Sequence, residues 1–401
     1  MGELVRGVFP GCGSSDGGAR VSQGSGLTAC RHSERLWWLL WSRCPGIGWV
    51  RLNSVIHAFC SLEVAWAQPA EAFGDLPGWH PGVLESFEGY RRGWGAEPLP
   101  ELARQLAGGR GVLLPGDGRW PVGIANLARP PLGLYWRGRG SLWSPLRRGA
   151  AVAVVGTRRP STHGLATARR LGEALAASGW PVVSGLAEGI DAAVHQGCLR
   201  GGGAPVAVLG TPLERVYPRH HHHLQEAVAG HGLLVSEQPP GSGVLPGHFA
   251  ARNRLQVALA SAVVVVECPA SSGALHSANL AWDQGLPLWV VPADAARASA
   301  AGSNRLLSRG ATPLLEPADL LATLGTGPLT RSLKGDPAAP EATLRFSAFQ
   351  RTLLEAVGTA ASLEDLTERL GEPPARVAVG LMELERAGCL QAEPGLVWRP
   401  S

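Results

Sequence analysis

The sequence has almost no lysine. Lys334 is the only lysine in 401 residues, so arginine supplies nearly all of the positive charge, and the formal net charge is +4. A net charge of this size does not by itself indicate a nucleic-acid partner. The positions of the arginines are more informative, because a guanidinium can pair with a phosphate through two parallel hydrogen bonds.

Clustered cysteines and long apolar runs are also missing. The seven cysteines are scattered, with no CxxC pair and no metal-ligand spacing, which is typical of reduced thiols. No uncharged apolar run reaches the roughly 18 residues of a membrane span. The first thirty residues are rich in Gly and Ser and lack the apolar core of a signal peptide. We therefore expect a cytoplasmic protein with no membrane partner.

Several enzyme motifs are absent. The sequence contains no GxxxxGK[ST], no complete GxGxxG with a downstream acid, no HExxH and no GxSxG. No acid/base pair or nucleophile–base pair stands out either. These absences predict a protein that is not an enzyme and that carries no cofactor and no metal.

Hydrophobic residues make up 45% of the chain and charged residues 17%, which suits a globular protein of two or three domains. Composition and pattern predict five segments along the chain. They are a disordered start (1–32), a helical domain (33–100), an α/β domain (108–326), a linker (327–343) and a second helical domain (344–401).

The first helical domain contains two apolar helical stretches from Leu36 onward, joined by Pro45-Gly46-Ile47-Gly48. This pattern resembles a helix-hairpin-helix or SAM-like domain, whose tight turn exposes N–H groups that can hold a phosphate. The alternative is a purely structural αα-hairpin. The Gly- and Pro-rich region from about Gly74 to Pro100 is predicted to link this domain to the next one.

From Gly111 onward, short apolar runs alternate with helical periodicity. Ala151–Gly156 is apolar throughout, as in a strand that is covered on both faces, and Gly164–Gly179 has the helical repeat. Repeated alternation of this kind predicts an α/β fold with a doubly wound parallel sheet.

The C-terminal segment predicts three helices and a short hairpin, which is typical of a winged helix. Ser362 and Asp365 resemble a capping pair at the start of the second helix. The third helix, Pro374 to Ala387, carries Glu383 and Glu385 among its arginines. It is less basic than a DNA-reading helix, which favours protein interaction or weak DNA contact.

Four loops follow predicted parallel strands, at the sheet edge where ligands bind in open α/β folds. In the first, Gly156, Thr157 and Arg158 combine a close backbone approach, a hydroxyl and a phosphate-pairing guanidinium. A plain strand-to-helix turn with surface arginines is the alternative. In the second, Ser184 and Gly185 precede Asp191. We interpret Asp191 as a cap for the following helix and a loop support rather than as a ribose-binding or catalytic acid.

The third and fourth loops add a base-stacking face and further anion donors. Phe249 offers an aromatic face, and Arg252, Asn253 and Arg254 follow it, a combination that suits a single nucleic-acid strand. In the fourth loop, Ser271, Ser272 and Gly273 form either a phosphate nest or an ordinary helix cap. The tract His220–His223 could suggest a metal, but adjacent residues rarely provide tetrahedral ligands, so we interpret it as incidental.

Taken in order, these segments resemble the DprA/Smf family of DNA-processing proteins of bacterial transformation. The likeness runs from about Leu36 to Leu324 and includes VVGTRRPSTHG, VSGLAEGIDAAVHQGCL, HFAARNRL and VVVVECPASSGALHSANLA. It implies an extended Rossmann fold and a single-stranded DNA-binding recombination mediator. Such a protein protects incoming DNA, binds it cooperatively, forms homodimers and loads RecA.

The resemblance also implies roles for individual residues. The glycine-hydroxyl-arginine loop that holds DNA phosphates falls on Gly156, Thr157 and Arg158. The stacking aromatic falls on Phe249, within Phe249–Arg254, and the serine-rich segment falls on Ser272, Gly273 and Ser277. The chain departs from the family pattern in four places. Ala250 replaces a proline, Gly247-His248 replaces a basic residue, His221 and His222 replace an amide and a base, and Ala293 replaces a glycine.

Two other functions remain open from the sequence alone. One is a nucleotide-binding or nucleotide-hydrolysing enzyme on a related Rossmann-like fold, although the Pro-Gly-Gly-x-Gly-Thr-x-x-Glu stretch of the lysine-decarboxylase-like family is absent. The other is a scaffold whose DNA pocket has decayed.

Overall fold

The computed structural model describes residues 23–95, 97–106, 111–330, 348–358, 361–386, 390–393 and 397–400. The chain divides into two compact units, Met1–Lys334 and Gly335–Ser401, each described by itself below. Most of the predicted disordered start and most of the predicted linker lie outside the described residues.

The first unit begins with helices packed around an aromatic core. They are α1 (Gln23–Ser42), α2 (Trp49–Phe59), α3 (Leu62–Trp66), a 3₁₀ turn η1 (Ala70–Phe73), α4 (Pro81–Trp94) and α5 (Pro98–Leu106). Trp41 is fully buried and stacks on Phe87 with ring centroids 4.9 Å apart. Burial of rings of this size dominates the stability of a small helical region.

The structure differs from the sequence-based expectation at two places in this region. The helix α1 begins at Gln23, before the predicted domain boundary at residue 33, and each residue added to an existing helix gains a hydrogen bond at low cost. The Gly- and Pro-rich region after Gly74 is not a linker, since it contains α4 and the start of α5. Pro81 stands at the first turn of α4, where proline is tolerated, and Val83 and Phe87 give that helix a buried face.

The predicted hairpin turn between α1 and α2 is present. Gly46 has φ +81°, a conformation that glycine adopts without strain, and Ile47 is buried in the helical core. The Arg51 guanidinium donates to the Gly46 carbonyl and, over 2.7 Å, to the Gly78 carbonyl. The turn is therefore held in place by its own helix.

The rest of this unit is an α/β domain with one sheet of nine strands in the described residues. The sheet order is β1-β2-β6-β5-β4-β3-β7-β8-β9. The strands are β1 (Gly111–Leu113), β2 (Leu134–Gly138), β3 (Val152–Val155), β4 (Val182–Ser184), β5 (Pro205–Leu209), β6 (Leu233–Ser236), β7 (Ala262–Val265), β8 (Leu288–Val290) and β9 (Thr312–Pro313). The strands from β6 to β9 along this order are parallel, while β1 and β2 extend the β6 edge antiparallel. The predicted doubly wound Rossmann-like sheet is confirmed, with this antiparallel edge as an addition.

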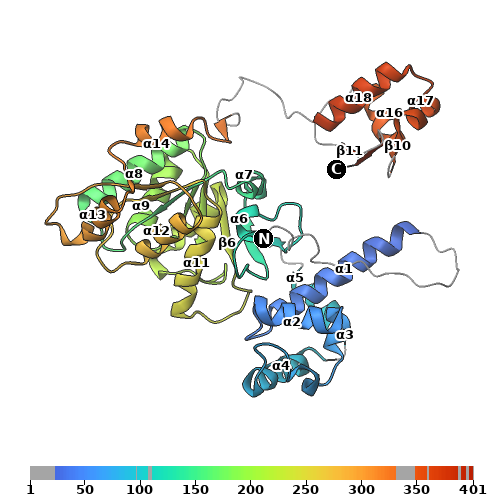
Figure 1. The fold of residues 1–401 in the computed structure, drawn as a ribbon, viewed down its shortest axis with the longest axis horizontal. Coiled ribbons are helices and arrows are strands. Elements are labelled where there is room, and N and C mark those ends of the chain that lie inside the picture. The colour runs from blue at the N-terminus through green and yellow to red at the C-terminus, as the bar shows by residue number, and fades with distance from the viewer. Residues whose placement is uncertain are drawn as a thin grey trace. The chain divides into compact units, whose positions relative to one another are not determined.

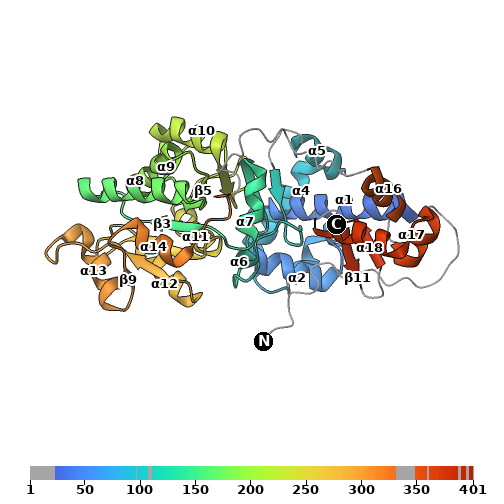
Figure 2. The same cartoon turned by 90° about the horizontal axis from the view of Figure 1, so that it is seen from above.

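Helices cover both faces of the sheet, as Figures 1 and 2 show. Val152 and Val154 of β3 face one core, with α8 (Thr162–Ala177), α9 (Ile190–Arg200) and α14 (Pro317–Leu324). Ala153 and Val155 face the other. That second face carries α6 (Val122–Ala125), α7 (Trp143–Arg147), α11 (Pro246–Ala258), α12 (Gly273–Asp283) and α13 (Ala301–Ser308). The helix α10 (His222–His231) packs against β5 and β6.

Helices α8 and α9 cross with their backbones in close contact. A Cβ at Gly197 would lie 2.1 Å from the Arg169 carbonyl oxygen, and one at Gly172 would lie 2.3 Å from the Val194 carbonyl oxygen. Both distances are far below van der Waals contact. The glycines therefore set how closely the two helices that follow β3 and β4 can pack.

The second unit has the winged-helix order. It comprises α16 (Ala348–Val357), β10 (Ala361–Ser362), α17 (Leu363–Leu370), α18 (Pro374–Arg386), β11 (Leu390–Glu393) and β12 (Val397–Pro400), with sheet order β10-β12-β11. The predicted cap is present: the Ser362 hydroxyl accepts from the Asp365 N–H over 3.2 Å, and the Asp365 carboxylate accepts from the Ser362 N–H. The Ser362 hydroxyl also donates to the Asp365 carboxylate over 2.8 Å, and this bond, followed by the one from the Ser362 N–H, holds the pKa of Asp365 below its usual value.

Within the described ranges, no helix has both the length and the apolar character needed to cross a membrane.

We predict that Gly197→Ala destabilises the protein by about 1–3 kcal/mol, because the added methyl group must push α8 and α9 apart. Gly89→Ala is the matched control, because a Cβ at Gly89 in α4 meets no atom within 4 Å. That change should be neutral or stabilise by up to about 1 kcal/mol. Urea unfolding followed by circular dichroism compares them, and equal midpoints would contradict the packing argument.

Candidate nucleic-acid interface

The strand order reverses between β3 and β7, which are parallel neighbours at the centre of the sheet. The segments that follow them lead to α8 and α12 on opposite faces, so a crevice opens at the carboxyl ends of these strands. A cavity of about 430 Å³ lies there, which we call the switch-point pocket. Its walls are the loop after β3, the loop after β4, one face of α11 and the start of α12.

Most of the predicted site residues meet in this pocket. Gly156, Thr157, Arg158, Phe249, Arg252, Asn253, Ser272, Gly273 and Ser277 line it. Ser184, Gly185 and Arg254 do not. Segments more than one hundred residues apart therefore contribute to one site, as expected for loops at the same edge of a parallel sheet.

A cation and two aromatic rings form the rim. The Arg158 side chain is exposed, and its guanidinium carbon lies 5.8 Å from the centroid of the Phe249 ring. The centroid of the Tyr217 ring lies 4.9 Å from that of the Phe249 ring. Gly210 permits this arrangement, because a Cβ there would come within 2.8 Å of the Phe249 ring. The rim thus offers a charge for a phosphate beside a face for a base.

The loop after β3 has a fixed shape. The Thr157 N–H donates to the Glu267 carbonyl oxygen over 2.7 Å, and the Thr157 hydroxyl accepts from the Arg159 N–H over 3.2 Å. Thr157 is itself buried. These bonds tie the loop to the end of β7 and leave Arg158 projecting from a rigid base.

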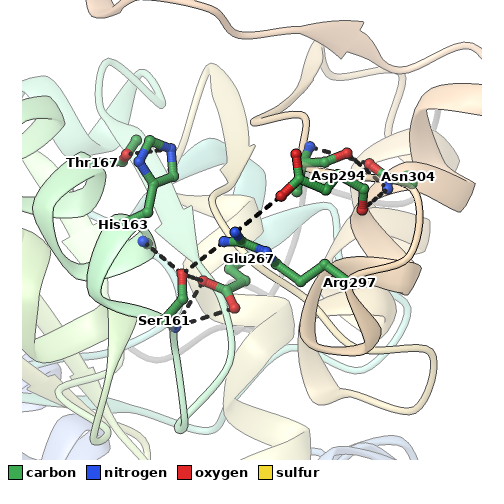
Figure 3. Close-up of polar contacts among 9 residues, drawn as sticks. Ser161, His163, Thr167, Glu267, Asp294, Arg297 and Asn304 are labelled. Atoms are coloured by element: carbon green, nitrogen blue, oxygen red, sulfur yellow. Dashed lines mark hydrogen bonds and ion pairs between the residues drawn. The ribbon is translucent and has the colours of Figure 1, made fainter.

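The carboxylate of Glu267 occupies the N-terminus of α8 (Figure 3). It accepts the Ser161 N–H over 3.0 Å and the Ser161 hydroxyl over 2.8 Å, and Glu267 is only 3% exposed. Ser161 in turn caps the helix by accepting the Gly164 N–H over 3.0 Å. A negative group is stabilised at this position by the helix dipole.

In dinucleotide-binding folds, the first helix N-terminus after a strand is where a pyrophosphate sits. Here a protein carboxylate fills that place. It fits so closely that a Cβ at Gly164 would lie 2.1 Å from a Glu267 oxygen. A nucleotide phosphate at this helix end would meet an occupied position and a like charge.

Further residues brace this anion position. Arg297 donates to the Ser161 hydroxyl over 3.3 Å and pairs with Asp294 at 3.1 Å. Asn304 donates to the Ala293 carbonyl over 3.0 Å and so holds the loop that carries Asp294. Sequence reasoning assigned no role to Glu267, Arg297 or Asn304. For Glu267, the signal in the sequence was a single acidic residue directly after an apolar strand. No motif distinguishes such a residue from one on the surface.

Ser184 and Arg252 were predicted as DNA contacts, but both side chains point inward. Ser184 is fully buried and its hydroxyl donates to the Val154 carbonyl over 2.7 Å. Arg252 is 4% exposed and donates to the Gly185 carbonyl over 2.8 Å and to the Val208 carbonyl. The Arg252 guanidinium fills the space that a Cβ at position 185 would need, so only glycine fits there. In this conformation Ser184 and Arg252 support the pocket floor from below.

The buried charge of Arg252 is balanced by Asp191. Burial lowers the pKa of Arg252 to about 10, and burial raises the pKa of Asp191 although Arg252 opposes that shift. The Gly185 N–H donates to the Asp191 carboxylate over 3.1 Å. This arrangement agrees with the loop support predicted for Asp191, whereas the N-cap of α9 is Gly189 and not Asp191.

Arg254 faces away from the switch-point pocket. Its guanidinium pairs with Glu237 at 2.5 Å, and burial raises the pKa of that carboxyl group. Arg254 lines a different and larger hollow. It is therefore separated from the Arg158–Phe249 rim by the body of α11.

The pocket floor contains polar atoms that have no partner. Gln256 and Ser277 are each 1% exposed and line the pocket. The Gln256 Nε2 and the Ser277 Oγ have no hydrogen-bond partner among the residues that the structure describes. Leaving such groups unpaired costs about 1–3 kcal/mol each. Beside them, Ser272 caps α12 by accepting the Ala274 N–H over 3.2 Å.

The histidine tract lies beside the loop after β4. His221 Nδ1 is 3.0 Å from the Leu186 carbonyl oxygen, and His220 is 3.4 Å from a Glu188 oxygen. In the part of the chain that the structure describes, no group of three His, Cys, Asp or Glu side chains is arranged to hold a metal ion.

Comparisons with known proteins show which family and which solved structures the chain resembles. Residues 111–325 match the family described as DNA recombination-mediator protein A. Protein Smf of Synechocystis sp. is 37% identical over 298 residues, which is 74% of each chain. The crystal structure of DNA processing protein A from Streptococcus pneumoniae superposes with a TM-score of 0.61 at 25% identity, covering 72% of this chain and 97% of that one. DNA processing protein A from Helicobacter pylori, which binds single-stranded DNA, matches at 31% identity and a TM-score of 0.48, covering 54% and 95%.

The buried His195 predicts how stability depends on pH. Burial, followed by the nearby charges of Arg252 and His221, lowers the pKa of His195 from 6.5 to about 3. Below pH 6.5, and down to about pH 3, His195 binds a proton in the unfolded chain but stays neutral in the folded protein. Stability should therefore fall as the pH drops from 6.5 toward 3, by up to about 1.4 kcal/mol per pH unit from this group.

His195→Met should flatten that acid dependence, because methionine has no proton to bind. His57→Met, at an exposed position in α2, is the control and should keep the wild-type slope. Urea midpoints measured between pH 7 and pH 5 check this, and parallel curves for wild type and His195→Met would refute it.

Proposed function

Because the chain belongs to the DNA recombination-mediator protein A family, we propose that its switch-point pocket binds single-stranded DNA for delivery to RecA. A recombination mediator acts by binding and positioning rather than by catalysis. The observation that carries the proposal is the rim, where the exposed Arg158 guanidinium stands 5.8 Å from the face of Phe249. A phosphate bound to Arg158 and a base stacked on Phe249 would be neighbouring parts of one nucleotide.

The blocked helix end favours a polymer over a free nucleotide. Since the carboxylate of Glu267 fills the anion position of α8, a terminal phosphate has no helix N-terminus to enter. An internal phosphate of a strand needs only to pass over the exposed Arg158 and the serines at the start of α12. This argues against a nucleotide-hydrolysing enzyme on the same fold.

The predicted site residues then divide into two roles. Arg158, Phe249, Asn253, Ser272 and Gly273 are proposed to touch the strand, because their groups reach the pocket or its rim. Gly156 lets the backbone pass beside Ile190, since a Cβ there would lie 2.5 Å from that side chain. The buried residues Ser184, Gly185 and Arg252, with Thr157, are proposed to position the loops. Ser277 is proposed to pair with the ligand from the floor.

Further parts of the proposal concern partners and location. We propose that the protein acts as a homodimer, that RecA receives the strand from it, and that this happens in the cytoplasm, where the chromosome is. The winged-helix unit is proposed as an interaction module rather than a sequence reader. Its α18 carries Glu383 and Glu385 beside its arginines, which does not suit a DNA major groove.

We predict that Arg158→Ala weakens binding to oligo-dT about tenfold at low salt and lowers the slope of log K against log salt by about 1. Arg159→Ala is the matched control, because Arg159 is also exposed but does not line the pocket. Fluorescence anisotropy over a salt series measures both. Equal effects of the two substitutions would mean that only general surface charge is involved.

Phe249→Leu should weaken binding further while keeping an apolar side chain at that place. Loss of one stacked base costs about 1–3 kcal/mol, and the loss should depend little on salt. If this variant binds oligo-dT as tightly as wild type does, the proposed stacking of a base on Phe249 is contradicted.

We also predict that nucleoside monophosphates neither compete with oligo-dT at millimolar concentration nor release free base on incubation. The reason is the occupied anion position at Ser161 and Glu267. Competition assays and chromatography of the incubated nucleotides test this. Release of free base would contradict the prediction and favour a nucleotide-hydrolysing enzyme.

A further inference from the structure

A larger hollow lies on the other side of α11, and the function proposed above does not use it. It has a volume of about 1130 Å³, compared with about 430 Å³ for the switch-point pocket. One wall is the turn and start of α2 at residues 42–51, together with the end of α4. The facing walls are residues 129–132 and the segment 237–248 that leads from β6 into α11. We call this hollow the hairpin groove.

The groove carries an excess of positive charge. Arg43, Arg51, Arg129 and Arg254 line it, and Glu237 is the one carboxylate among the described lining residues. Glu237 is already neutralised by Arg254 at 2.5 Å. Arg129 is exposed and has no partner in the described residues, so it is available to a ligand anion.

Aromatic rings stand among these cations. Trp49, Tyr90 and Trp94 line the groove, each partly exposed. The Arg43 guanidinium carbon lies 5.9 Å from the Trp94 ring centroid, and the Tyr90 and Trp94 rings meet edge-on at 5.9 Å. Cations interleaved with aromatic faces are what a single nucleic-acid strand requires, because its phosphates and bases alternate.

The wall contributed by the hairpin is stiff. Arg51 donates to the Gly46 and Gly78 carbonyls and so holds the turn closed. The N-cap of α2 is Gly48, which has no side chain to cover the first N–H groups of that helix. The turn therefore presents backbone donors beside Trp49 without needing to rearrange.

The two hollows are adjacent along α11. Phe249, Arg252, Asn253 and Gln256 line the switch-point pocket, whereas His248 and Arg254 line the hairpin groove. His248 and Phe249 are consecutive residues at the start of this helix. A strand leaving the Phe249 rim thus needs to pass only the first turn of α11 to enter the groove.

We propose that the hairpin groove is a second single-stranded DNA subsite, which holds the continuation of the strand bound at the switch-point pocket. This rests on the proposed function. The sites differ in role: the pocket holds the strand at the Arg158–Phe249 rim, and the groove extends the footprint over the N-terminal helical region. The hairpin turn then contacts DNA and is not only structural.

The test uses the full-length protein and two oligo-dT lengths, about 4 and about 16 nucleotides, which bracket the site size of a single-strand-binding domain. The groove variant is Arg43→Ala with Arg129→Ala. Arg170→Ala is the control, since Arg170 is exposed on α8 and lines neither hollow. We expect the groove variant to bind the long oligonucleotide at least about fivefold more weakly, with a lower salt slope, and the short one as wild type does.

The outcomes separate the two proposals. If Arg158→Ala weakens binding of both lengths but the groove variant binds both as wild type does, the groove proposal is overturned and the proposed function stands. If Arg158→Ala leaves both lengths unaffected, the proposed function itself fails. If the groove variant binds DNA normally but no longer supports RecA loading, the groove is a protein-docking surface and the proposal is overturned.

Photocrosslinking supplies a second measurement that does not depend on affinity. A long oligonucleotide with 4-thiothymidine at successive positions should crosslink to peptides that contain Trp49 or Trp94 from one end only. Peptides around Phe249 should crosslink from positions next to these. Absence of crosslinks to residues 43–51 and 90–94, in a sample that crosslinks at Phe249, would contradict the proposal.

Discussion

The carboxylate of Glu267 at the N-terminus of α8 is the constraint on which the rest of the site depends. It pairs with the N–H and hydroxyl of Ser161, while its backbone carbonyl accepts the Thr157 N–H. One residue at the end of β7 therefore fixes both ends of the loop after β3. It also converts a phosphate-binding helix end into an internal structural contact, so the ligand must be held from the rim instead.

Two buried groups of opposite charge, Arg252 and Asp191, fix the floor of the pocket. Arg252 replaces the missing side chain of Gly185 and donates to backbone carbonyls at the ends of β4 and β5, and Asp191 balances its charge. Removing one partner of such a pair leaves an uncompensated buried charge, which is costly. The buried contacts of Glu267 and Arg252 thus hold the segments that carry the exposed Arg158 and the half-buried Phe249.

Much of the fold could be predicted from local pattern. Uniformly apolar runs such as Ala262–Val266 identify strands covered on both faces, and the helical repeat identifies α8, α9 and α12, because burial on a sheet imposes these periodicities. The exceptions have local causes. The strand β9 is two residues long and exposed, and α4 lies in a segment whose glycines and prolines hid the buried face of Val83 and Phe87.

The sequence alone determined that four loops of anion-binding character follow parallel strands, and that an aromatic residue precedes a basic segment on one of them. Chain order and residue type are sufficient for that. Only the tertiary structure decided which of these side chains face a ligand. Arg252, Asn253 and Arg254 are consecutive, yet the turn of α11 sends the first into the core, the second to the pocket and the third to the hairpin groove. Helix rotation and the packing of α11 on the sheet set those directions, and neither can be read from three adjacent letters.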